Sequence, residues 1–346
     1  MTTTTARSPR AYLLRATALA VTLIVSTAPT VATPALAARV PATVRTTPTA
    51  STGPIESTGP IEGTGPIEGT GHTESAAFPV SISSADGKVT IPARPTRILC
   101  LSASATQMLY SIGAGHQVVG VDEYSTWPPG APRTKFTGAE TNAEDYLYLH
   151  PDLVIFAFSE GKVIQQLKAL GIPALLLPPA EGFSGVYQQV DELGLATGHE
   201  AAAQRLDRSL ARFLASEQQR AANAGRGRTY YIELSPDYYT ATSKTFIGAE
   251  FSLFGMRDIA DAASHGGSYP QISAEYLLKA NPDYVFLADT VCCKVTPANF
   301  AKRPALSLLQ AVKSHHVYGV NDSVASEWGP HTVEEFVAFL AHLLRP

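Results

Sequence analysis

Hydrophobic and polar positions follow two alternating periods along most of the chain, and the pattern begins near Phe78. From there to residue 92, apolar and polar residues alternate with period two around Asp86 and Gly87, which predicts a β-hairpin. Short apolar runs follow, such as residues 97–101 and 117–122, and segments with helical spacing separate them. Strands that alternate with helices predict parallel sheets with helices on both faces.

One stretch of the chain occurs twice. Residues 142–156 read NAEDYLYLHPDLVIF and residues 273–287 read SAEYLLKANPDYVFL, with the same offset at every matched position. Each copy has the pattern of a short helix, a Pro-Asp turn and a buried strand. A repeat this long predicts two related α/β lobes rather than a solenoid. Asp152 and Asp283, which follow the prolines, are interpreted as turn residues and not as a catalytic acid pair.

Residues 199 to 223 carry the longest unbroken helical pattern of the chain. Its apolar residues recur every three or four positions and form one stripe: Ala203, Leu206, Leu210, Phe213 and Leu214. At about 1.5 Å per residue such a helix is roughly 35 Å long, enough to connect the two lobes. We therefore predict a rigid helix between them.

The remaining pattern predicts shorter helices and a division of the chain into five segments. The helices are expected at about 105–112, 161–170, 184–194, 247–254, 304–312 and 332–344. The segments are 1–37, an export signal; 38–77, a spacer; 78–198, the first lobe; 199–224, the connecting helix; and 225–346, the second lobe.

The amino terminus has the composition of an export signal. Three arginines precede an apolar run at residues 16–25, and Ala35-Leu36-Ala37 provides small residues for cleavage. The spacer contains the units STGPIE, STGPIE, GTGPIE and GTGHTE at 51–74, which cannot bury enough surface to fold. No cysteine precedes Cys100, so we expect no lipid anchor at the cleavage site. With an export signal, the protein is expected to be extracytoplasmic, and we also expect it to be a monomer. The alternative is that the uncleaved apolar segment anchors the protein.

Composition narrows the classes of function. The chain is 45% hydrophobic and 16% charged, and its 30 acidic residues exceed its 26 basic ones. An acidic exported protein without clusters of lysine and arginine is a poor nucleic-acid ligand. Neither a nucleophile elbow nor a phosphate loop occurs, and the histidines do not have metal-ligand spacing. We therefore expect no catalytic residues, no bound metal and no cofactor.

The loops that follow the predicted strands are the candidate ligand-binding elements. In open parallel sheets, ligands bind beyond the carboxyl ends of the strands. Aromatic rings concentrate there, which suits a large and partly planar ligand. The candidate ligand-binding residues are Ser102, Ser104, Tyr124, Trp127, Tyr238, Tyr239, Asp289, Cys292, Cys293 and Trp328.

The cysteines fall into two groups. Cys100 lies inside an apolar strand and is interpreted as a small core residue. Cys292 and Cys293 are adjacent, and oxidation to a vicinal disulfide would fit an exported protein. Free thiols that bind a metal are the alternative.

Residues 94–131, RPTRILCLSASATQMLYSIGAGHQVVGVDEYSTWPPGA, and the two repeat copies resemble the binding proteins of ABC importers for cobalamin and ferric siderophores. The resemblance covers roughly residues 90 to 344. It implies a class III periplasmic binding protein: two α/β lobes, one rigid connecting helix and a ligand clamped between the lobes. It also implies that one exposed glutamate per lobe binds arginines of the permease, and these map by motif onto Glu144 and Glu275.

Two features qualify that resemblance. Asn142 and Ser273 are good N-caps, and a carboxylate in the first helical turn is stabilised by the helix dipole, so capping alone could explain both glutamates. The family usually has Thr-Glu where this chain has Thr106-Gln107, so Gln107 cannot supply a charge.

The leading hypothesis is therefore an exported receptor of an ABC importer for an iron-siderophore or a corrinoid. The alternatives are an exported enzyme that processes heme or another metal chelate, and a secreted scavenger that works without a permease. Rings at these loops suit siderophores, cobalamin and heme alike. Lys244 and Arg257 could meet an anionic siderophore.

Overall fold

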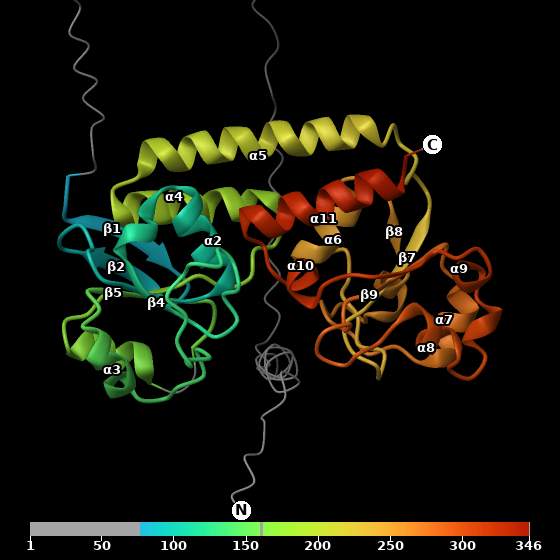
Figure 1. Ribbon diagram of the computed structural model, residues 1–346, viewed down its shortest axis with the longest axis horizontal. Coiled ribbons are helices and arrows are strands. Elements are labelled where there is room, and N and C mark those ends of the chain that lie inside the picture. The colour runs from blue at the N-terminus through green and yellow to red at the C-terminus, as the bar shows by residue number, and fades with distance from the viewer. Residues whose placement is uncertain (1–76, 160–161, 346) are drawn as a thin grey trace, which may run out of the picture. The chain divides into compact units, whose positions relative to one another are not determined.

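The structure is a computed structural model that describes residues 77–159 and 162–345. The predicted export signal and all but the last residue of the predicted spacer lie outside the described residues. Figure 1 shows the described part as two α/β lobes. Lobe 1 comprises the elements from β1 to α4, and lobe 2 comprises those from β7 to α11.

Lobe 1 contains the predicted hairpin and a parallel four-stranded sheet. The hairpin strands β1 (Val80–Ser84) and β2 (Gly87–Ile91) pair antiparallel. The sheet has the order β4-β3-β5-β6, with β3 at Ile98–Leu101, β4 at Val118–Val121, β5 at Leu153–Phe156 and β6 at Ala174–Leu176. Every residue of β3 and β5 is buried, because helices cover both faces of a parallel sheet.

The helices of lobe 1 divide between the two faces of its sheet. They are α2 (Ala103–Ser111), η1 (Ala114–Gln117), η2 (Ala143–Leu149), α3 (Val163–Ala169) and α4 (Phe183–Thr197). Figure 1 shows α2 and α4 on one side and α3 on the other. α2 ends before Gly113, whose φ of 87° is the left-handed conformation that glycine often adopts just after a helix.

Lobe 2 repeats this architecture. Its sheet has the order β10-β9-β7-β8, with β7 at Thr229–Glu233, β8 at Arg257–Asp258, β9 at Tyr284–Leu287 and β10 at Val317–Gly319. Its helices are α6 (Phe246–Ser252), η3 (Ala260–Ala263), α7 (Ala274–Ala280), α8 (Pro297–Ala301), η4 (Leu306–Leu308), α9 (Gln310–Lys313), α10 (Asp322–Ser326) and α11 (Pro330–Leu343). The predicted fold class of two parallel sheets flanked by helices is thus confirmed.

The repeated stretch has the same role in both lobes. Tyr146 and its counterpart Leu277 are fully buried, and so are Val154 and Val285. Asp152 accepts hydrogen bonds from the backbone and hydroxyl of Thr96, just before β3. Asp283 accepts the same pair from Thr229, the first residue of β7. The two aspartates are therefore turn residues that tie neighbouring strands together, as predicted.

The long helix α5 (Glu200–Arg220) confirms the helix predicted between the lobes. It packs against α4 of lobe 1 and against α11 of lobe 2 (Figure 1). Its stripe contributes the buried residues Ala203, Leu210 and Leu214. A helix that contacts both lobes along its length restricts their relative movement.

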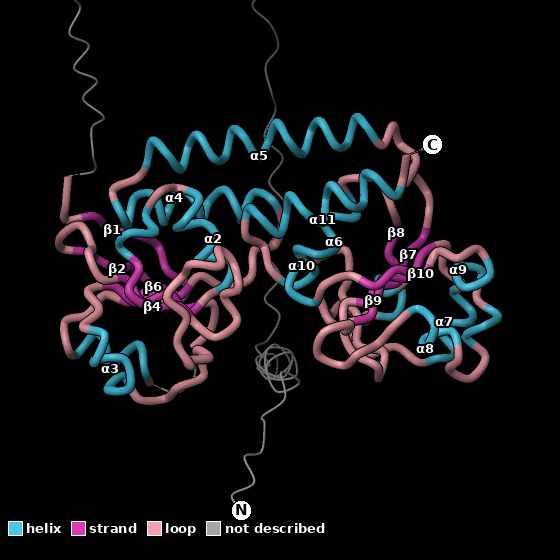
Figure 2. Tube along the Cα trace, viewed as in Figure 1, coloured by secondary structure: helices cyan, strands magenta, loops and turns pink. Residues whose placement is uncertain are grey.

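Two local predictions are wrong. The helix expected at 304–312 is interrupted, because Leu309 has extended backbone (ψ 139°) between η4 and α9. The side chain of Asn281 accepts a hydrogen bond from the backbone of Gln310 and stabilises the separate start of α9. The loop expected at 102–104 is the beginning of α2 instead, with Ser102 as its N-cap. Figure 2 shows how short helices and loops alternate in this part of lobe 2.

Candidate ligand-binding pocket between the lobes

Gln107 joins the two lobes by hydrogen bonds. It lies on α2 and is buried, and its amide nitrogen donates to Glu327 Oε2 at 2.7 Å. Its amide oxygen accepts from the backbone N–H of Thr332 at 3.1 Å. One side chain of lobe 1 thus satisfies two groups of lobe 2. Sequence reasoning treated Gln107 only as a lost charge and missed this role.

The same junction holds Trp328 and requires a glycine beside it. The backbone N–H of Trp328 donates to Ser104 Oγ at 3.0 Å, and its indole N–H donates to Gln189 Oε1 at 2.7 Å. A Cβ on Gly329 would lie 2.3 Å from Gln107 Oε1, so only glycine allows this approach. We call these contacts of Gln107, Trp328 and Gly329 the inter-lobe joint. Trp328 is 8% exposed, and its predicted ligand contact stays a prediction.

A pocket opens beside the joint, and both lobes line it. Its volume is about 240 Å³. Trp127 forms part of its wall and stacks on His331 of α11, with ring centroids 4.9 Å apart. This inter-lobe pocket is lined by Gln107, Thr126, Trp127, Asn321, Ser323, Val324, Glu327, His331, Thr332 and Glu335. Of the residues predicted from the sequence, Trp127 is the one that reaches it.

Glu327, which lines this pocket, and its buried neighbour Asp122 are both carboxyl groups with raised pKa values. Burial, together with the charge of Asp122, raises the pKa of Glu327 to about 8. Burial also raises the pKa of Asp122 to about 6, although Asp122 Oδ1 accepts a hydrogen bond from the backbone of Ser125 at 2.8 Å. Near neutral pH, Glu327 is therefore largely neutral.

Exchanging Gln107 for glutamate (Gln107→Glu) should destabilise the joint in a pH-dependent way. Glutamate usually ionises near pH 4.5, whereas folded Glu327 keeps its proton until about pH 8. The free energy of unfolding therefore falls as the pH rises through this window. A second carboxyl beside Glu327 steepens the fall, so we expect a loss of about 1–3 kcal/mol at high pH and less at low pH. Denaturant unfolding of the wild type and of Gln107→Glu across this pH range measures the difference in the free energy of unfolding.

The control is Gln204→Glu, at an exposed position of α5. It should leave the free energy of unfolding unchanged across the same pH range. A Gln107→Glu difference that did not vary with pH would contradict the assigned contact with Glu327.

A second polar cluster lies at the carboxyl ends of β7 and β9. Arg303 donates to both oxygens of buried Glu233, at 2.8 and 2.7 Å. Its guanidinium lies 5.6 Å from the ring centre of Tyr238. Burial, followed by the charge of Glu233, raises the pKa of Asp289 to about 8. The positive charge of Arg303 is thus already paired within lobe 2.

Cys292 and Cys293 occupy the loop after β9. Both are free thiols and half-buried, and their Sγ atoms are 2.7 Å apart. Cys100 is fully buried in β3, where burial raises the pKa of its thiol to about 12. Within residues 77–159 and 162–345, no cluster of three or more His, Cys, Asp or Glu residues could hold a metal ion.

The other predicted ligand residues have varied surroundings. Ser102 is buried as the N-cap of α2, and its hydroxyl accepts a hydrogen bond from the backbone of Ala105. Tyr124, Tyr238 and Tyr239 are half-buried. Their ligand contacts stay predictions. The residues that the sequence analysis missed are Gln107, Gln189, Glu327, His331 and Thr332. Of these residues, only Glu327 could have been selected from the sequence, because it is adjacent to Trp328, which was predicted to contact the ligand.

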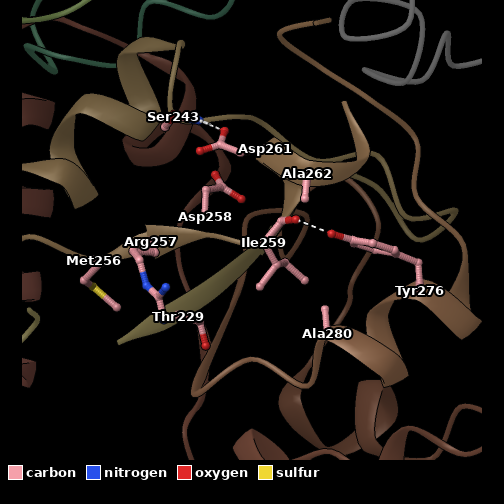
Figure 3. A pocket seen from close by; sticks show the side chains of 10 residues that line it. All are labelled: Thr229, Ser243, Met256, Arg257, Asp258, Ile259, Asp261, Ala262, Tyr276 and Ala280. Atoms are coloured by element: carbon pink, nitrogen blue, oxygen red, sulfur yellow. Dashed lines mark hydrogen bonds between the residues drawn. The ribbon is translucent and has the colours of Figure 1, made fainter. Parts of the chain in front are cut away.

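A larger pocket of about 380 Å³ belongs to lobe 2 alone. Figure 3 shows the hydroxyl of Tyr276 donating to the backbone of Ile259, and Asp261 accepting from the backbone of Ser243. Arg257 also lines this pocket and donates to the backbone of Gly227 at 3.2 Å. Of the side chains that the sequence suggested for ligand contact, Arg257 alone lines this pocket, and all of its lining residues belong to lobe 2. We therefore place the candidate ligand site in the smaller inter-lobe pocket.

The two candidate docking glutamates are exposed. Glu144 is in the first turn of η2 and Glu275 is in the first turn of α7. The capping hydrogen bonds are accepted by the side chains of Asn142 and Ser273. Among the described residues, neither glutamate carboxylate has a hydrogen-bond or ion-pair partner. The caps are thus complete without them.

Comparison with known proteins identifies the family. Residues 98–324 match the model of the periplasmic binding protein family. The chain belongs to this family. It is 32% identical over 271 residues to an ABC transporter substrate-binding lipoprotein of Bacillus subtilis, covering 75% of this chain and 84% of that protein. It is 28% identical over 275 residues to a cobalamin-binding protein of Halobacterium salinarum, covering 75% and 73%.

Solved structures of other periplasmic proteins have the same fold. The periplasmic vitamin B12 binding protein of Vibrio cholerae aligns with a TM-score of 0.60 at 24% identity, over 72% of this chain and 97% of that one. A periplasmic heme-binding protein of a Roseiflexus species aligns with a TM-score of 0.65 at 21% identity, over 72% and 98%. The predicted resemblance is confirmed. These relatives are binding proteins rather than enzymes.

The comparisons bear only in part on the predicted location. A relative from Bacillus subtilis is a lipoprotein, so the absence of a lipid anchor in this chain stays a prediction. No helix within the described residues is both long and apolar enough to span a bilayer. The boundaries of the five predicted segments likewise stay predictions.

Proposed function

We propose that this protein is the extracytoplasmic receptor of an ABC importer and that it captures a corrinoid between its lobes. Membership of the periplasmic binding protein family supports the receptor function over the enzyme alternative. Relatives named as cobalamin- and vitamin B12-binding proteins support the ligand class. The observation that carries the choice of a corrinoid over an anionic chelate is the charge of the inter-lobe pocket.

That pocket offers carboxyl, amide and hydroxyl groups and the imidazole of His331, but no lysine or arginine among the described residues that line it. Two of these residues, Glu327 and Glu335, are acids. An anionic siderophore or the propionates of heme would find no lysine or arginine here to pair with, and their charge would lie beside the carboxyl groups of Glu327 and Glu335. A corrinoid presents neutral amide side chains, which donate hydrogen bonds to carboxyl oxygens and accept them from amides such as Gln107.

The arginines near the ligand loops of lobe 2 do not contribute positive charge to this pocket. Arg303 is paired with Glu233. Arg257 lines the separate pocket of lobe 2. The aromatic surface of Trp127 instead provides an uncharged plane for a macrocycle. A volume of about 240 Å³ accommodates only an edge of such a ligand, so the rest lies against the half-buried rings of the neighbouring loops.

A panel of ligands tests this proposal. Cobalamin, heme and a ferric catecholate siderophore are each added to the purified protein, and thermal unfolding is followed. A ligand at 100 times its dissociation constant adds roughly 2.7 kcal/mol to the free energy of unfolding, so cobalamin should raise the melting temperature by several degrees. A shift with heme or the siderophore but not with cobalamin refutes the corrinoid proposal. If none of the three shifts the melting temperature, the receptor proposal itself fails.

A further inference from the structure

The loop that carries Cys292 and Cys293 is held by a single carboxylate. The backbone N–H groups of Val291 and Cys292 donate to Asp322 Oδ1 at 2.9 Å and to Oδ2 at 2.8 Å. The hydroxyl of Thr290 donates to the backbone oxygen of Val320 at 2.8 Å. Both oxygens of one side chain are thus used by consecutive backbone groups. The loop after β9 is therefore fixed against the start of α10.

This arrangement brings two thiols together. The Sγ atoms of Cys292 and Cys293 are in contact, and both side chains are half-buried. Burial is the main cause of the raised pKa of the Cys292 thiol, and the neighbouring Cys293 and Asp322 raise it further. A disulfide is readily reduced when the thiolate of the reduced form is stabilised. The surroundings of Cys292 disfavour its thiolate, so the oxidised form is favoured.

We propose that Cys292 and Cys293 form an intramolecular disulfide outside the cytoplasm and that this bond, through Asp322, holds the α10 wall of the inter-lobe pocket. The oxidant is a disulfide, such as oxidised glutathione or a thiol-disulfide oxidoreductase. Two S–H bonds break and one S–S bond forms. Two electrons and two protons pass to the oxidant, whose own disulfide becomes two thiols.

The pairing follows from where the cysteines lie. The chain contains three cysteines. Cys100 is fully buried in β3 of lobe 1 and its thiol donates to the backbone oxygen of Ser102 at 3.4 Å. Bonding to it would require unfolding of the lobe 1 sheet. Cys292 and Cys293 are thus the pair available for an internal bond in the native protein.

Asp322 connects this bond to the ligand site. It is the first residue of α10, and the adjacent residues Asn321 and Ser323 line the inter-lobe pocket. Reduction would free the backbone of residues 291–293 and weaken its hydrogen bonds to Asp322. The effect on ligand binding rests on the proposed function, whereas formation of the bond does not.

Alkylation and mass spectrometry test the bond itself. The full chain is exported to an oxidising compartment, purified without reductant, denatured and treated with iodoacetamide before and after reduction. We expect Cys100 to be labelled in both samples and Cys292 and Cys293 to be labelled only after reduction. Labelling of all three cysteines without reductant overturns the proposal, and so does a bond that links two chains.

Variants test the role of Asp322. Titration with dithiothreitol gives the concentration that reduces half of the protein. Asp322→Asn should be reduced at a severalfold lower concentration, because its loop no longer holds the thiols together and a negative charge beside them is lost. Cys100→Ala is the matched control and should behave like the wild type. Equal midpoints for wild type and Asp322→Asn overturn the assigned role of Asp322.

Affinity measurements complete the test. Reduction should weaken cobalamin binding severalfold in the wild type and in Cys100→Ala. The double variant Cys292→Ser/Cys293→Ser should bind like the reduced wild type and ignore the reductant. Affinity that is the same in both redox states overturns the coupling to the pocket. If cobalamin binds in neither state, the proposed function fails while the alkylation result still stands.

Discussion

Trp127→Ala is expected to weaken cobalamin binding by about 2 kcal/mol or more, which is roughly 30-fold in the dissociation constant. Trp127 is the aromatic ring that lines the inter-lobe pocket and stacks on His331. Large, rigid rings at the centre of a binding site carry much of the binding energy, because they bury much apolar area at little entropic cost. Isothermal titration calorimetry measures the change directly.

The control for this variant is Tyr148→Ala, which also removes an aromatic ring from lobe 1. Tyr148 is 64% exposed and does not line the pocket, so its loss should leave the affinity unchanged. Trp127→Phe should retain part of the affinity, since a smaller ring can still stack. Circular dichroism and the melting temperature of the free protein show whether each variant is folded. A folded Trp127→Ala protein with wild-type affinity would remove Trp127 from the ligand site.

The architecture could be predicted because the apolar positions of the repeated stretch are the positions that become buried. Its apolar positions are dictated by two local requirements: a helix with one buried face and a strand with two. Val154 and Val285 are therefore fully buried at equivalent places in the two lobes. The stripe of α5 was predictable for the same reason.

The inter-lobe joint was not predictable from periodicity, because its partners are distant in the sequence. Gln107 and Glu327 are 220 positions apart, and Gln189 and Trp328 are 139 apart. A buried polar residue is stable only when its partner is present, and a local pattern does not show the partner. Gln107 differs from the family pattern and was interpreted as a loss. A neutral amide instead donates to Glu327 without placing a second carboxyl group beside it.

The short elements of lobe 2 escaped prediction for another reason. Helical spacing at 304–312 is genuine, but one extended residue, Leu309, divides it. The side chain that caps the second piece, Asn281, comes from the end of α7. Tertiary capping of this kind overrides local propensity, and it is visible only when the partner is in place.

The joint also bears on how the protein meets its permease. Gln107, Trp328 and the long helix α5 restrict the movement of one lobe against the other. Each lobe carries one of the exposed glutamates, Glu144 or Glu275. Two contacts on a rigid body bind together only if their spacing matches the partner, and then the second contact forms at high effective concentration. A rigid pair of lobes thus suits a receptor that docks at two points.

Charge reversal at these glutamates is expected to reduce transport without affecting ligand capture. Glu144→Arg or Glu275→Arg places like charges opposite the arginines proposed on the permease, and close charge pairs at interfaces contribute about 1.5–7 kcal/mol. We expect uptake of cobalamin into vesicles that contain the permease to fall roughly tenfold or more for either variant. The dissociation constant for cobalamin and the melting temperature should stay at their wild-type values, because both side chains are exposed and unpaired among the described residues.

Asp145→Arg is the matched control, since Asp145 is exposed in the same turn as Glu144 and carries the same charge. If docking depends on the glutamate position, this variant should transport nearly as well as the wild type. An equal loss for Asp145→Arg would indicate general electrostatic attraction instead of a specific contact. Full uptake by both glutamate variants would show that the two carboxylates are dispensable, and their capping neighbours Asn142 and Ser273 would then account for the repeated motif.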